Sequence, residues 1–243
     1  MSPALKILSV VVSLVVIAVV VLMLAGPSMQ RSLFYPKPRQ LPPVVSQSTS
    51  ELLARLQSVL ESNAPAVARS LQPGLTDAQI GELEAQGGFQ LTGDLKALYR
   101  WHNGMTSNST VGLLPGQKFV PLDEVVLIRR LNGEQLASVP TVQRAAFSAF
   151  AGHTKGWVHI VDDGAGDGFF YDPKRTEAEG AFFGHFAETG DYSWFPSLRN
   201  FLAGVIECYE SRVVRVAADG ENLDADFVRL QQVWERLAES RNR

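Results

Sequence analysis

The most informative part of this sequence is Asp162-Asp163-Gly164-Ala165-Gly166-Asp167-Gly168-Phe169-Phe170-Tyr171-Asp172-Pro173. It follows a strand-like run at residues 157–161 and contains a second one at residues 169–171. The glycines and aspartates between these runs permit positive φ angles and a tight reversal of the chain. The pattern therefore predicts a β-hairpin with an acidic tip.

Short amphipathic helices are predicted before this hairpin. Residues 48–51 (Ser-Thr-Ser-Glu) and 76–79 (Thr-Asp-Ala-Gln) have the form of capping boxes, and apolar residues follow each at helical spacing. Thr92 is the expected N-cap of a third helix, which we expect to end at Gly104. A further helix is predicted at residues 123–131.

The middle of the chain carries short apolar runs that are typical of strands, at residues 111–114, 119–120 and 181–186. Helices are expected again from Ser197 and in the C-terminal segment at residues 217–243. The last of these helices has apolar residues at helical spacing that we expect to face inward, namely Phe227, Leu230, Trp234 and Leu237. This order of elements predicts an α+β fold with a mixed or antiparallel sheet flanked by helices.

A long apolar segment opens the chain at residues 5–25, where Lys6 is the one charged residue. A helix of this length reaches about 31 Å, which matches the hydrocarbon core of a bilayer. The sequence therefore predicts one transmembrane helix before the α+β domain and a single-pass membrane protein. A cleaved signal peptide is the alternative, but Met23 stands where a small residue is wanted at the cleavage site.

The flanks of the apolar segment favour one orientation. Arg31, Lys37 and Arg39 follow it, whereas Lys6 and the α-amine precede it. This excess of positive charge predicts a cytoplasmic domain, and a periplasmic or extracellular domain stays open. A proline-rich linker would hold the domain up to roughly 60 Å from the bilayer. The predicted division is a transmembrane anchor at 1–27, a linker at 28–47, the α+β domain at 48–216 and a C-terminal helix at 217–243.

Several of these segments, in this order, are similar to the SUKH superfamily, which contains the Smi/Knr-like domain. A helix-ending aromatic–His–Asn–Gly motif and the hairpin carry much of the resemblance, which covers about residues 50–210. The similar segments are Leu71–Thr76, Leu98–Gly104, Trp157–Pro173, Gly180 with His185, and Ser197–Leu202. Two positions depart from the family pattern, because Leu91-Thr92-Gly93 and His159 stand where proline is common.

The resemblance implies an α+β fold and a binding role without catalysis. Bacterial members of the superfamily resemble immunity proteins that neutralise toxins, and fungal relatives regulate cell-wall assembly. The implied function is a membrane-anchored immunity-type protein that binds a toxin. The alternative is a regulator or scaffold of envelope assembly with an envelope-assembly protein as its partner.

Two motifs supply the residues expected to contact this protein partner, namely the acidic hairpin and the helix-ending corner. The candidate residues are Trp101, His102, Asn103, Gly104, Asp162, Asp163, Asp167, Tyr171 and Asp172. The aspartates are also the groups that a hydrolase would need, which is the weakest of the three functional hypotheses.

Other site chemistry finds little support in the sequence. Asp163 and Asp167 match the first and fifth positions of a calcium loop, but Ala165 and Lys174 stand where oxygen ligands are needed. The histidines lack the spacing of a zinc site, and no catalytic or cofactor-binding motif is present. We therefore expect no metal, no cofactor and no enzyme activity.

Charge and cysteine content narrow the partner class further. The net charge is −3 at pH 7 and no Lys/Arg cluster is dense, and the pI is about 5.8. Nucleic-acid binding is therefore not expected. A single cysteine, Cys208, excludes an internal disulfide, and its apolar helical neighbours predict a buried, inert thiol.

Overall fold

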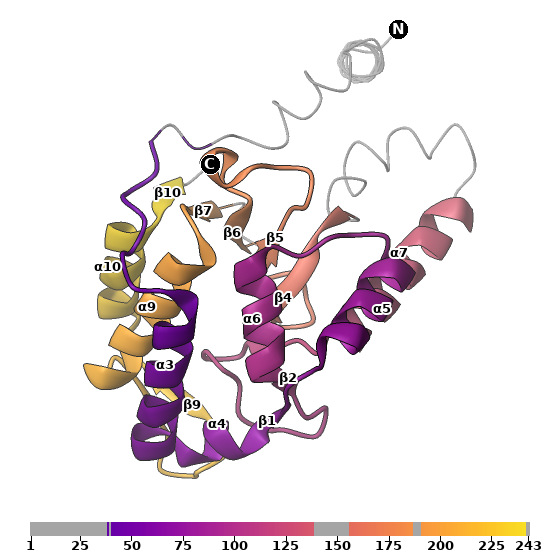
Figure 1. The fold of residues 1–243 in the computed structure, drawn as a ribbon. Helices are drawn as coiled ribbons and strands as arrows, with labels where there is room; N and C mark the ends of the chain where they lie inside the picture. Colours follow the sequence, from indigo (N-terminus) through magenta and orange to yellow (C-terminus); the bar gives the residue numbers. More distant parts are fainter. Residues whose placement is uncertain (1–37, 39, 139–155, 187–190, 242–243) are drawn as a thin grey trace, which may run out of the picture. The chain divides into compact units, whose positions relative to one another are not determined.

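The computed structural model of the protein describes residue 38 and residues 40–138, 156–186 and 191–241 (Figure 1). Contacts divide the chain into two units, one formed by residues 1–37 with 131–155 and the other by residues 38–130 with 156–243. Of the first unit, only the end of one helix is described. The second unit, called here the folded domain, contains the sheets and the other described helices.

Helices form the first part of the folded domain. They are α3 (Thr49–Asn63), α4 (Pro65–Ser70), α5 (Asp77–Gly87), α6 (Gly93–Trp101) and the start of α7 (Leu122–Ser138). Both predicted capping boxes are confirmed, because Ser48 pairs with Glu51 before α3 and Thr76 pairs with Gln79 before α5. Thr92 accepts the N–H of Leu95 and so caps α6, as predicted.

The central sheet is antiparallel, with the strand order β10-β7-β6-β5-β4-β3. Its strands are β3 (Lys118–Phe119), β4 (Val158–Asp162), β5 (Gly168–Tyr171), β6 (Phe182–Phe186), β7 (Asp191–Phe195) and β10 (Glu239–Arg241). The predicted hairpin is β4–β5. Two smaller antiparallel pairs are β1 (Leu71–Pro73) with β2 (His102–Met105), and β8 (Val214–Val216) with β9 (Leu223–Ala225). The α+β fold is thus confirmed.

Two predictions about where elements form or end are wrong. Residues 111–114 form no strand, and Leu114 makes only an isolated bridge with Gln117. The chain folds back on itself there, so a Cβ on Gly112 would lie 2.2 Å from the carbonyl oxygen of Gln117. Helix α6 ends at Trp101 rather than near Gly104, because residues 102–105 pair as β2 with β1.

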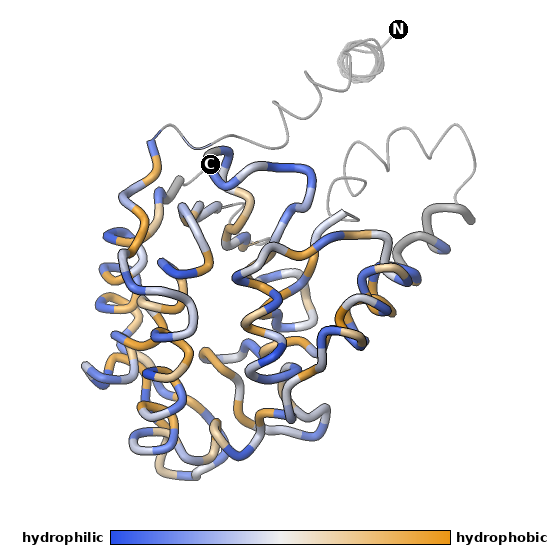
Figure 2. Tube along the Cα trace, in the orientation of Figure 1, coloured by the Kyte–Doolittle hydropathy of each residue, from blue (hydrophilic) through white to orange (hydrophobic). Residues whose placement is uncertain are grey.

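One face of the sheet packs on helix α9 (Leu198–Glu210), which begins one residue after Ser197 as expected. Phe169 of β5 and Phe182 of β6 contact Phe201 of α9, with ring centroids 4.6 Å and 5.2 Å away. Helix α9 also packs along α3, and apolar and polar residues alternate on these helices (Figure 2). Each buried phenylalanine contributes about 1.5–3 kcal/mol by leaving water.

The opposite face of the sheet carries aromatic side chains that contact one another, and it is called the aromatic face below. Phe170 of β5 lies 5.2 Å from the ring of Trp157 and 6.0 Å from that of Phe183. All of its large members are buried, namely Trp157, Phe170, Phe183, Tyr192 and Trp194. Adjacent residues of β5 therefore point to opposite faces, as strand geometry requires.

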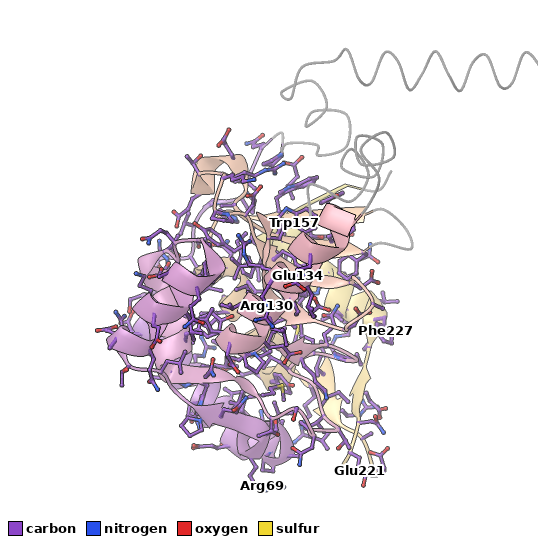
Figure 3. All side chains as sticks on the ribbon, turned by 90° about the vertical axis from the view of Figure 1, so that its right-hand side faces the viewer. Arg69, Arg130, Glu134, Trp157, Glu221 and Phe227 are labelled. Atoms are coloured by element: carbon purple, nitrogen blue, oxygen red, sulfur yellow. The ribbon has the colours of Figure 1, made fainter. Side chains whose placement is uncertain are left out.

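Helix α10 (Phe227–Leu237) contains the predicted apolar positions, but its first turn is not buried. Trp234 stacks on Phe201, with ring centroids 5.8 Å apart. Phe227 is 68% exposed, so the prediction that it faces inward is wrong (Figure 3). A periodic pattern specifies one face of a helix but not how far along it the neighbouring surface extends.

The described part of the proline-rich segment contacts helix α9 and strand β10. Asn200 of α9 accepts the N–H of Val45 at 3.1 Å and donates to the carbonyl oxygen of Pro43 at 3.0 Å. The N–H of Gln40 donates to the Glu239 carboxylate of β10 at 2.9 Å. The predicted division into anchor, linker, domain and C-terminal helix stays a prediction.

Among the described helices, none has the length and apolarity needed to cross a membrane. The predicted span at residues 5–25 lies outside the described residues. Membrane anchoring therefore stays a prediction from the sequence.

Candidate protein-binding surface

The turn between β4 and β5 is built around the Asp163 carboxylate. Its Oδ1 accepts the backbone N–H groups of Ala165 at 2.7 Å, Gly166 at 3.0 Å and Asp167 at 3.0 Å. Gly164 and Gly166 have φ angles of 80° and 113°, which favour glycine. The side chain of Asp163 is exposed, and the turn presents it in one fixed orientation.

Asp162, the last residue of β4, lies at the base of this turn and is buried. Its Oδ1 accepts the N–H of Gly164 at 2.5 Å, and its Oδ2 pairs with Nδ1 of His159. The sequence predicted that Asp162 contacts a partner. In the structure it is buried at the base of the turn, where it accepts the hydrogen bond from Gly164. The His159 contact was missed, because residues three apart on a regular strand point to opposite faces.

Tyr171 and Asp172 lie at the other end of β5 and are also buried. Burial raises the pKa of the Tyr171 phenol, and the charges of Asp172 and Glu177 raise it further. The Asp172 carboxylate accepts the N–H of Lys174 at 2.9 Å and lies 3.6 Å from Nε of Arg175. These contacts order the chain after β5, away from the acidic tip.

The corner after α6 begins with Trp101 and His102, both half-buried. The His102 ring contacts the carbonyl oxygen of Gln72 through Nδ1 at 2.6 Å. Its Nε2 contacts Oε1 of Gln57 at 3.0 Å. His102 therefore connects β2 with β1 and with α3.

Asn103 and Gly104 join the corner to the start of α7. Oδ1 of Asn103 accepts the N–H of Leu122 at 2.8 Å, and its Nδ2 donates to Asp123 at 3.3 Å. Gly104 has a φ of 71°, and a Cβ there would lie 2.3 Å from the backbone nitrogen of Pro121. Only glycine fits this close approach of two backbones.

Strand β3 lies between the two candidate motifs. Lys118 of β3 pairs in register with Asp162, and the N–H of Val120 donates to the carbonyl oxygen of Ile160 at 2.9 Å. On the other side, Gly104 contacts Val120 and Pro121. Strands β2 and β3 and the hairpin therefore lie next to one another, so the two motifs are neighbours in the structure.

Only part of the predicted set is accessible. Asp163 is exposed, and Trp101, His102, Asn103 and Asp167 are half-buried. Sequence reasoning missed Asp123 and Glu124, which are exposed on the first turn of α7 beside Asn103. Two consecutive acids at an expected helix start were the available signal. The assignment of these residues to a partner stays a prediction.

Arg129 of α7 is a second residue that the sequence did not single out. Its guanidinium donates to the carbonyl oxygens of Gly87, Gly156 and Trp157, and it lies 5.0 Å from the centroid of the Phe89 ring. Burial lowers the pKa of Arg129, and the charge of Asp172 opposes that shift. All three carbonyl groups lie far from Arg129 in the sequence, so no local pattern indicated the contact.

Residue types that bind metals do not cluster in the described structure. Within residue 38 and residues 40–138, 156–186 and 191–241, no three His, Cys, Asp or Glu side chains gather as a metal site would need. Cys208 is buried in α9 as predicted, and burial raises the pKa of its thiol to about 12, with a smaller effect of Glu207.

The family comparison covers the region just described. A model of the SMI1 / KNR4 family (SUKH-1) matches residues 74–204, which is more than half of the 243 residues. Among curated proteins, none matches the sequence. The matched region contains strands β2 to β7 and all of the candidate residues. The chain therefore belongs to the SMI1 / KNR4 family (SUKH-1).

Proposed function

We propose that this protein is a membrane-anchored immunity protein that neutralises a toxin by binding its surface, without catalysis. The observation that carries the proposal is the family match at residues 74–204, because SUKH proteins are generally non-catalytic immunity proteins. The apolar segment at residues 5–25 supplies the anchor in this proposal.

The contact surface that we propose combines the acidic turn with the corner after α6. Asp163 supplies an exposed carboxylate whose position is set by three backbone N–H groups. A carboxylate has further lone pairs, so Asp163 retains acceptor capacity for a partner's Arg or Lys. Because the turn is ordered before binding, little conformational entropy is lost on association.

The acids on α7 extend this surface. Asp123 and Glu124 are exposed next to Asn103, and Asp167 is half-buried in the turn. Charges of one sign on neighbouring elements attract an oppositely charged partner and speed its association. We therefore propose that the toxin presents a basic surface to this side of the domain.

The experiment is co-expression of the full chain with the toxin encoded by the neighbouring reading frame, read as cell growth, together with affinity capture from membranes. We expect growth to be rescued and the toxin to be captured. The double variant Asp163→Asn, Asp167→Asn removes two charges, while the amide oxygen at position 163 can still accept the hydrogen bonds of the turn. This variant should lose rescue.

Asp219 offers a matched control in the loop between β8 and β9. Its Oδ1 also accepts successive backbone N–H groups, those of Glu221 at 2.9 Å and Asn222 at 3.0 Å. Asp219→Asn should leave rescue and capture unchanged. Capture of envelope-assembly proteins in place of a toxin, with a cell-wall defect on deletion, would replace the immunity role by the regulatory one.

A further inference from the structure

A β-bulge in β4 changes which residues share a face of the sheet. His159 pairs with Phe170 and Val161 pairs with Phe169, so Ile160 is an extra residue on β4. Without the bulge, His159 and Asp162 would point to opposite faces. The bulge places both side chains on the aromatic face, where they meet.

The His159–Asp162 pair is connected directly to the acidic turn. One carboxylate oxygen of Asp162 pairs with Nδ1 of His159, and the other accepts the N–H of Gly164 at 2.5 Å. Gly164 is the first residue after Asp163, whose carboxylate is the exposed charge of the turn. A change at His159 therefore reaches the turn through a single carboxylate.

The surroundings of His159 combine aromatic rings with a few charged groups. Its ring meets Phe170 edge to face at 4.9 Å, and the side chains of His159 and Asp162 are 14% and 8% exposed. Among the described residues, strand register and the turn bring these titratable groups next to the pair: Lys118 opposite Asp162 on β3, His185 opposite Gly168 on β6, and Asp163 and Asp167 in the turn.

We infer that His159 is the positioning residue of the acidic turn, and that the proton it carries sets how firmly the turn is held. This inference rests on the proposed function in one respect, namely that the turn is the contact surface. His159 does not contact the toxin in this inference. It acts on the turn through Asp162.

The direction of the effect follows from hydrogen-bond chemistry. Protonated His159 donates from Nδ1 to an ionised carboxylate, and such charge-assisted bonds are roughly twice as strong as neutral ones. With a neutral His159 the bond is weaker and the carboxylate is less firmly fixed. The hydrogen bond from Gly164 then weakens as well, so the turn is more ordered with a charged His159 than with a neutral one.

The experiment is an NMR titration of the full chain in detergent micelles between pH 5.5 and 8.5. It follows the His159 ring and the backbone amide of Gly164. We expect both signals to move with one midpoint. In His159→Gln, whose amide can still donate to Asp162 without a charge, the Gly164 amide should stop responding to pH.

Two further variants guard against misfolding and indirect effects. Asp162→Asn retains an oxygen that accepts the Gly164 N–H, and it should also abolish the pH response of that amide. His185→Gln changes the other histidine of this sheet face and should leave the response intact. A Gly164 amide that does not move with pH, or one that still moves in both His159→Gln and Asp162→Asn, would overturn the inference.

A binding measurement then tests whether this effect of His159 on the turn changes the affinity for a partner. With the toxin as partner, affinity of the native chain should fall about three- to tenfold between pH 6 and pH 8, and that of His159→Gln should change much less. An affinity of the native chain that is independent of pH would also count against the inference. Because the NMR titration needs no partner, failure of the inference and failure of the immunity role give different results.

Discussion

The side-chain oxygen of Asn103 accepts the backbone N–H of Leu122 at 2.8 Å, across 19 residues of chain. Leu122 is the first residue of α7, where N–H groups have no partner within the helix. The same Asn103 donates to Asp123 at 3.3 Å. The motif after α6 therefore has a structural role, in addition to any contact with a partner.

Replacing Asn103 with alanine should destabilise the domain by about 1 kcal/mol, because it removes this cap. Urea unfolding followed by circular dichroism measures the loss. Asn108→Ala is the matched control, since Asn108 is exposed in the following loop, and its effect should be within about 0.5 kcal/mol. Equal effects of the two variants would contradict the capping role.

Two glycines with nearly the same φ angle allow the energetic cost of backbone strain to be measured apart from the cost of steric crowding. Gly104 and Gly116 have φ values of 71° and 73°, but a Cβ meets Pro121 in the first and open space in the second. Gly116→Ala should cost about 1 kcal/mol, which is the order of the positive-φ penalty. Gly104→Ala should cost clearly more or prevent folding. Thermal unfolding of both variants, run side by side, decides between the two effects.

Cys208 should be almost unreactive in the native protein. Its thiol is buried, and its pKa is raised to about 12. Iodoacetamide at pH 8 should alkylate it in guanidinium chloride but hardly at all in buffer, as measured by mass spectrometry. Rapid alkylation of the native chain would show that α9 opens readily.

The same pKa shift makes a prediction about alkaline stability. The folded state retains the thiol proton, whereas an unfolded cysteine loses it near pH 8.5. The contribution of Cys208 is therefore complete below about pH 8.5 and declines as pH rises toward 12. Cys208→Ala should flatten that part of the stability profile, and an unchanged slope would contradict the assignment.

Helix α10 should depend on Trp234 and hardly on Phe227. Trp234 stacks on Phe201 at 5.8 Å, whereas Phe227 is 68% exposed (Figure 3). Trp234→Ala should cost about 3 kcal/mol, and Phe227→Ala less than about 0.5 kcal/mol. Denaturant midpoints of the two variants test this contrast. A large effect of Phe227→Ala would indicate a contact beyond the described residues.

Local features were accessible from the sequence. The capping pairs at Ser48 and Thr76 act within four residues, so they predict where α3 and α5 begin. The β4–β5 hairpin was predictable for a similar reason, because glycine and aspartate at its tip define the turn by short-range hydrogen bonds. The apolar period of α10 also predicted that a helix forms in this segment.

Relations between distant segments depended on the tertiary structure. Short motifs were enough to predict where α3, α5, α6 and α9 begin, as well as the hairpin and the family resemblance, since these rest on neighbouring residues. The sequence by itself did not determine that Phe227 is exposed or that Asn103 caps α7, because both depend on which surfaces meet in space. The meeting of His159 with Asp162 was decided by one extra residue in a strand pair, and strand register is a property of both strands together.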